Sequence, residues 1–115
     1  MENINLKELR TIIDQIDSEI IQLLSKRFDA TEKVGIYKAK NNLMAQDTTR
    51  ESEKFEKIIK LSEETNLNPD YSVEIFRCIM DVAISRHREI QGRVNGTDTS
   101  TGHAEERADS LTRSL

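Results

Sequence analysis

The sequence has few of the features that mark secreted or membrane proteins. Cys78 is the only cysteine among 115 residues, so no intrachain disulfide can form, and a reducing compartment is expected. The first residues, Met1-Glu2-Asn3, carry no basic leader, and no apolar run is long enough to cross a membrane. We therefore expect a cytoplasmic protein with no membrane partner.

Aromatic residues and net positive charge are also scarce. Aromatic residues make up 4% of the chain, Trp is absent, and the formal net charge is −4. Proteins that bind nucleic acid usually present a basic surface or aromatic side chains on which bases stack. The composition therefore disfavours a nucleic-acid partner.

Glycine and proline are nearly absent from the first 91 residues, where only Gly35 and Pro69 occur. By contrast, residues 92–115 are rich in Gly, Ser and Thr and have no apolar periodicity. A segment of that composition cannot bury enough apolar surface to fold by itself. We predict one helical domain over residues 1–91 and a disordered tail over 92–115.

The apolar residues of the first 91 positions predict an all-α protein with three helices. The first helix covers residues 4 to about 40, the second runs from Asp47 to about Thr65, and the third begins at Pro69. Positions three and four apart form the seam of the first helix: Leu6, Leu9, Ile13, Ile16, Ile20, Leu23, Arg27, Ala30, Val34 and Lys38. No alternating pattern typical of a strand occurs.

The first helix is too long for so small a protein to cover. About 37 residues of α-helix would extend roughly 55 Å, which exceeds the size of a 115-residue globule. A second chain can bury the uncovered seam, so the length of this helix predicts a helical dimer.

Two cations occupy seam positions where an apolar residue is expected. Arg27 and Lys38 are eleven residues apart, about three helical turns, so both project from one face of the helix. Their stems could pack while their charged ends reach solvent, or they could fix the register of the pairing. Two cations on one apolar face otherwise indicate an anion-binding site.

Polar residues at the start of the second helix form another group. Asp47, Arg50 and Glu51 are spaced to share one face and could line a ligand site. Capping explains the same pattern, because Glu51 could reach back to the amide of Thr48 in a capping box. Asp47 could equally cap the helix.

The third helix carries Ala83 and His87, four residues apart on its apolar face. A histidine in such a position is usually a core residue.

Arg10, on the first helix, lies 28 residues, or about 42 Å of helix, from Lys38. Arg10 is therefore either a surface charge or part of a site formed with a second, antiparallel chain.

The order and spacing of a larger set of residues resemble one known family. The set comprises Leu9-Arg10, Ile13-Asp14, Ile16-Asp17, Leu23-Leu24, Arg27, Val34-Gly35, Tyr37-Lys38, Asp47 and Arg50-Glu51. Over roughly residues 4–91 the chain resembles the all-helical (AroQ-type) chorismate mutases. The resemblance implies an intertwined homodimer of three-helix subunits. It also implies the Claisen rearrangement of chorismate to prephenate, a shikimate-pathway step toward phenylalanine and tyrosine.

The resemblance also implies roles for individual residues. Arg10 of the partner subunit and Arg27 would bind the two substrate carboxylates, and Lys38 would donate to the ether oxygen. Asp47 and Glu51 would contact the C4 hydroxyl. Such a reaction needs a compact substrate conformer and fixed cations rather than a nucleophile, so neither cofactor nor metal is expected.

Three further positions complete the implied site. Arg50 would lie at the pocket wall. Ala83 stands where the family commonly has a small hydroxylated residue, so one hydrogen bond to a carboxylate would be lost. His87 stands where the family has Gln or Glu beside the ether oxygen, and imidazole can donate there in either protonation state.

Other functions fit parts of the pattern. Relatives act as mutases on 4-amino-4-deoxychorismate or as isochorismate pyruvate lyases. The polar residues at the second helix start disfavour the lyase, whereas two carboxylates there would also suit an amino group. Ala83 and His87 are the only residues that point to a non-catalytic helical module. A purely structural helical dimer leaves Arg27 and Lys38 unexplained.

Overall fold

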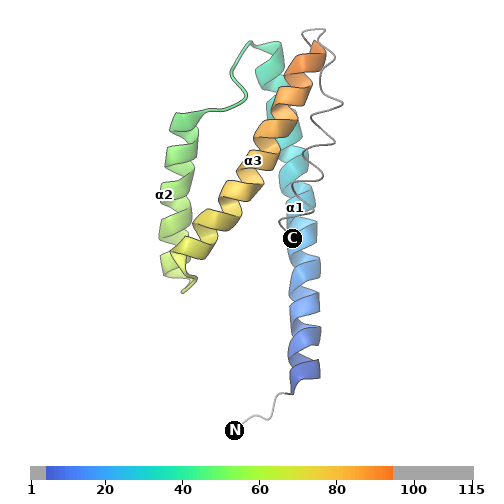
Figure 1. Ribbon diagram of the computed structural model, residues 1–115, viewed down its shortest axis with the longest axis vertical. Helices are drawn as coiled ribbons and strands as arrows, with labels where there is room; N and C mark the ends of the chain where they lie inside the picture. The colour runs from blue at the N-terminus through green and yellow to red at the C-terminus, as the bar shows by residue number, and fades with distance from the viewer. Residues whose placement is uncertain (1–4, 95–115) are drawn as a thin grey trace. The chain divides into compact units, whose positions relative to one another are not determined.

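The computed structural model describes residues 5–94, which form three α-helices (Figure 1). Helix α1 spans Leu6–Lys40, α2 spans Thr48–Glu64 and α3 spans Pro69–Val94. No strand occurs in this part of the chain. The predicted all-α class, with three helices and a very long first helix, is confirmed. None of the helices within residues 5–94 has both the length and the apolar character that crossing a membrane requires.

Helix α3 continues past the predicted domain boundary. It includes Gly92, Arg93 and Val94, which the composition of the C-terminal segment had assigned to the tail. A glycine within a helix costs only about 1 kcal/mol relative to alanine, so Gly92 does not end α3. The rest of the predicted tail, residues 95–115, lies outside the described residues.

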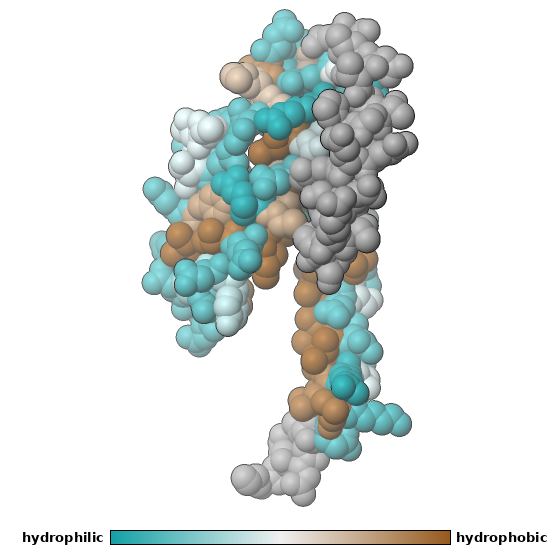
Figure 2. Space-filling model, viewed as in Figure 1, coloured by the Kyte–Doolittle hydropathy of each residue, from teal (hydrophilic) through white to brown (hydrophobic). Residues whose placement is uncertain are grey.

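The chain divides into two compact units within α1, Met1–Thr31 and Glu32–Leu115. In the first unit, Asn5 Oδ1 accepts a hydrogen bond from the Glu8 amide at 2.9 Å and caps the start of α1. Apolar side chains gather along this part of α1 (Figure 2), and each is 43–67% exposed. They are Leu6, Leu9, Ile12, Ile13, Ile16, Ile20, Ile21 and Leu23. We call these eight residues the α1 apolar stripe.

In the second unit, local signals set the helix ends. Asp47 is the N-cap of α2, and its Oδ1 accepts from the Arg50 amide at 3.0 Å. Asn42 and Asn66 follow α1 and α2 with φ values of 56° and 58°, in the left-handed region that asparagine tolerates. Pro69 opens α3, where its missing N–H costs nothing.

Helices α2 and α3 pack side by side in the second unit (Figure 1). The buried apolar residues of this unit are Ala39, Ala45, Ile58, Met80, Ala83 and Ile90. A buried polar contact also joins the two helices. The hydroxyl oxygens of Ser62 and Ser72 lie 2.6 Å apart, and Ser62 also bonds the Ile58 carbonyl.

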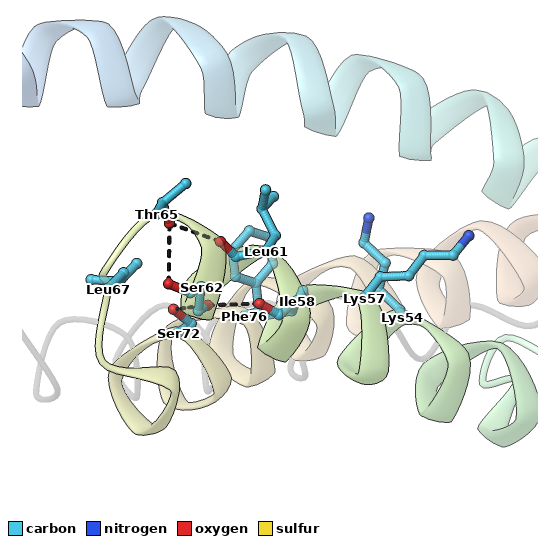
Figure 3. Close-up of a pocket in the computed structure, with 9 residues that line it drawn as sticks. All are labelled: Lys54, Lys57, Ile58, Leu61, Ser62, Thr65, Leu67, Ser72 and Phe76. Carbon is cyan, nitrogen blue, oxygen red and sulfur yellow. Dashed lines mark hydrogen bonds between the residues drawn. The ribbon is translucent and has the colours of Figure 1, made fainter.

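An open apolar cavity of about 280 Å³ lies beside this contact (Figure 3). Its lining comes from α2, α3 and the turn that joins them: Lys54, Lys57, Ile58, Leu61, Ser62, Thr65, Leu67, Ser72 and Phe76. Of the residues predicted for the functional site, none lines this cavity.

Candidate functional site

The structure places Lys38 beside His87 at the C-terminal end of α1. Lys38 Nζ donates to the Ala45 carbonyl at 3.1 Å and lies 3.5 Å from His87 Nδ1. An ammonium has three N–H groups and no lone pair, so in a hydrogen bond between the two groups Nδ1 is the acceptor. Lys38 is held by two groups and has a third N–H to donate.

His87 is buried, with 5% of its surface exposed, and packs against Gly35 of α1. A Cβ placed on Gly35 would lie 2.5 Å from His87 Cδ2, closer than carbon atoms approach, and a tight 3.0 Å from Nε2. The glycine therefore makes room for the imidazole. Ala83, one turn earlier on α3, is buried as well.

Side chains of α1 and α3 hold the loop between α1 and α2. Gln91 Nε2 donates to the Leu43 carbonyl at 2.6 Å, and Lys38 holds Ala45 two residues later. Arg88 reaches Gln46 Oε1 at 3.5 Å. This loop carries Gln46 and leads to the cap of α2, so its position decides where the polar start of α2 lies.

Glu51 is held by two donors from different segments. Arg77 Nη1 of α3 donates to Oε1 at 2.7 Å, and Gln46 Nε2 donates to Oε2 at 3.1 Å. The Arg77 hydrogen bond, with that of Gln46, lowers the pKa of the Glu51 carboxyl below its ordinary value of 4.5. The capping-box alternative is wrong in detail, because Asp47 caps α2 while Glu51 binds Arg77 and Gln46.

Three predicted residues remain: Arg50, Arg10 and Arg27. Arg50 is exposed on the first turn of α2, and its amide completes the Asp47 cap. Arg10 is exposed and Arg27 is partly buried in the first unit, each on α1. Their roles, like those of the other site residues, stay predictions.

Helical periodicity did not single out Arg77 or Gln46, which both donate to Glu51. Arg77 has an acidic residue four positions later, Asp81, and this spacing alone suggests an ordinary surface pair. Its contact with Glu51 joins residues 26 positions apart and is not readable from helical periodicity. Gln46 lies in a polar loop stretch and has no distinguishing pattern.

Comparison with known proteins gives a consistent result. Residues 9–88 match the profile of the family described as chorismate mutase type II. The chain is 37% identical over 101 residues to a bifunctional chorismate mutase/prephenate dehydratase of Aquifex aeolicus, covering 85% of this chain and 28% of that protein. A protein of the same description from Buchnera aphidicola is 31% identical over 75% of this chain and 22% of its own length.

A shorter relative is also similar. The protein described as chorismate mutase in Methanocaldococcus jannaschii is 29% identical over 76 residues, which cover 66% of this chain and 77% of that protein. The chain thus spans about a quarter of the length of the bifunctional relatives it matches.

Proposed function

Because the chain belongs to the chorismate mutase type II family, we propose that it rearranges chorismate to prephenate. The observation that carries the proposal is the contact of the half-buried Lys38 with the buried His87 inside the matched segment. Such a pair suits a reaction in which negative charge develops on one oxygen and no covalent intermediate forms.

The pair supplies donors where the C–O bond breaks. An ether oxygen beside Lys38 Nζ and His87 Nδ1 accepts from the ammonium in place of Nδ1. The ring also donates to it once Nδ1, released from Lys38, carries the ring proton. The bond to the Ala45 carbonyl fixes the lysine in advance, so no reorganisation is needed as the transition state forms. Ala83 offers only a methyl group, so the carboxylate near it relies on the cations.

The acidic residues at the start of α2 bind the neutral end of the substrate. Glu51 is ionised near neutral pH, since its pKa lies below 4.5, and it accepts from the C4 hydroxyl. Asp47 assists while it caps α2, because a carboxylate has about four lone-pair sites. Arg50 borders this end of the site.

A second copy of the chain completes each site in the proposal. Arg27 and the partner subunit's Arg10 bind the two substrate carboxylates through the planar, bidentate geometry that guanidinium favours. The exposure of the α1 apolar stripe supports a homodimer, because eight large apolar side chains along one helix are costly to leave in water.

The direct test measures the loss of chorismate absorbance with purified protein and identifies the product. We expect prephenate. Lys38→Ala should lower kcat by at least about 10²-fold, the usual cost of losing one transition-state donor. The exposed Lys40→Ala, at the same end of α1, is the matched control and should leave kcat unchanged. Release of pyruvate, or turnover of only the 4-amino substrate, would contradict the proposal.

A further inference from the structure

The carboxylate of Glu51 is the point at which three segments meet. It projects from α2. Its Oε1 accepts a hydrogen bond from Arg77 of α3, and its Oε2 accepts one from Gln46 of the preceding loop. The Glu51 side chain is only 13% exposed, whereas that of Arg77 is 44% exposed. One donor on each oxygen fixes both the position and the plane of the carboxylate.

Arg77 is itself held from other sides. Its guanidinium lies 4.7 Å from the centroid of the Phe55 ring, within the range of a cation–π contact. Its Nη1 also lies 3.5 Å from Asp81 Oδ1, one turn further along α3. Because Phe55 lies on α2 beside Glu51, the arginine is fixed relative to the helix that carries the carboxylate.

The arrangement leaves Glu51 able to bind a third donor. A carboxylate offers about four lone-pair sites, and Arg77 and Gln46 use one on each oxygen. With two donors in place, the remaining sites point in defined directions. The same two donors favour the ionised form, in which Glu51 can only accept.

We propose that Arg77, together with Gln46, is a positioning residue that orients the Glu51 carboxylate to accept the hydroxyl of the substrate. The inference rests on the proposed function and adds to it a residue that does not touch substrate. Loss of Arg77 would leave Glu51 free to rotate and easier to protonate. Both effects weaken the binding of a substrate hydroxyl that must be held in one orientation.

The chain offers a matched control in the pair of Arg86 and Glu32. Arg86 of α3 binds Glu32 of α1 through its Nε at 2.8 Å and its Nη2 at 2.8 Å, and it also binds Glu89. The Arg86 pair makes more hydrogen bonds than the Arg77 pair, so Arg86→Gln should disturb stability at least as much as Arg77→Gln. Neither Arg86 nor Glu32 has a role in the proposed site.

The experiment compares Arg77→Gln, Arg77→Lys, Gln46→Met and Arg86→Gln with the parent protein. Carbon NMR of the Glu51 carboxyl gives its pKa without any substrate, and steady-state kinetics with chorismate give kcat/KM as a function of pH. For Arg77→Gln we expect the Glu51 pKa to rise toward 4.5 and kcat/KM to fall at least about tenfold. The acid limb of the kcat/KM profile should move to higher pH.

The other variants make the result specific. Arg77→Lys keeps the charge and should restore part of the lost kcat/KM, and Gln46→Met should raise the Glu51 pKa by a smaller amount. Arg86→Gln should leave both the Glu51 pKa and kcat/KM at parental values. An active parent whose Arg77→Gln variant matches Arg86→Gln in both readouts would overturn the positioning role. Absence of prephenate from the parent protein would instead overturn the proposed function.

Discussion

The imidazole of His87 is buried against α1. Its ring lies on the face of α1 at Gly35, and its Nδ1 faces Lys38 one turn further along α1. A residue with only 5% of its surface exposed cannot move without repacking its neighbours. The steric fit against α1 and the proposed donor role therefore concern the same side chain.

Gly35→Ala tests the steric fit between His87 and α1. Alanine alone would favour the helix by about 1 kcal/mol, but its Cβ would lie 2.5 Å from His87 Cδ2. Overpacking costs about 1–3 kcal/mol, so we expect a net loss of stability and a lower kcat. Urea unfolding of Gly35→Ala, His87→Ala and the double variant checks this. Strictly additive effects would argue against a clash between the two positions.

His87→Leu and His87→Gln test the proposed role of His87 as a hydrogen-bond donor to substrate. Leucine keeps the buried apolar volume and removes the donor, so kcat should fall by about 10²–10³-fold. Glutamine retains a donor and cannot titrate, so His87→Gln should stay active. Any dependence of kcat on pH between about 5 and 8 that arises from the ring should disappear. A parental kcat in His87→Leu would make the histidine a core residue only.

At the scale of elements, side chains of α3 contact every other segment named in the second unit: α2, the loop before it and α1. Arg77 holds Glu51 of α2, Gln91 and Arg88 hold the loop, and Arg86 holds Glu32 of α1. Each contact joins residues distant in sequence. Displacement of α3 would therefore disturb the loop and the start of α2 together.

The Arg86–Glu32 pair should make stability depend on pH. Its hydrogen bonds lower the pKa of Glu32 below the ordinary value of 4.5. Because the pKa is lower in the folded state, the stabilisation is complete above pH 4.5 and is lost as pH falls through the folded pKa. Glu32→Gln should flatten this acid dependence and cost no more than about 1 kcal/mol at pH 7, since the pair is partly exposed.

Urea unfolding between pH 3 and 7 measures the effect. The protein concentration is held fixed, because the proposed dimerisation would make stability depend on concentration. Glu53→Gln is the control, as Glu53 is exposed on α2. An identical acid slope in Glu32→Gln and the parent protein would show that the pair is not linked to folding.

At the scale of the whole molecule, a single chain leaves the apolar side chains of the α1 apolar stripe exposed to water. Eight residues of 43–67% exposure on one helix differ from the scattered apolar residues that ordinary surfaces carry. A homodimer in which α1 pairs with its twofold mate would cover them.

Mixing two inactive variants tests whether Arg10 serves the partner's site. Arg10→Ala and Arg27→Ala should each be inactive as homodimers. After subunit exchange, each mixed dimer has one site lacking both arginines and one site with both intact. Random exchange should restore about a quarter of parental activity, because half of the dimers are mixed and each has one intact site. No recovery after verified exchange would mean that Arg10 acts within its own chain or not at all.

The sequence by itself determined the three helices and most of their ends. Periodic apolar residues, the Asp47 cap and Pro69 act within one or two turns of the backbone, so a linear pattern is enough to read them. The end of α3 was misjudged by three residues, because a single glycine is a weak stop signal. Family resemblance added the expected roles of the cations, which periodicity only marked as misplaced.

Only the tertiary structure decided which side chains meet. Lys38 and His87 are 49 residues apart, and Glu51 and Arg77 are 26 apart. The sequence left Glu51 divided between capping and binding, because both need the same residue at the same helical position. Packing of α3 against α2 excluded the capping box by bringing a guanidinium within 2.7 Å of the carboxylate, and the binding role stays a prediction. Contacts between helices depend on how the helices pack against one another, and no local pattern along one helix encodes them.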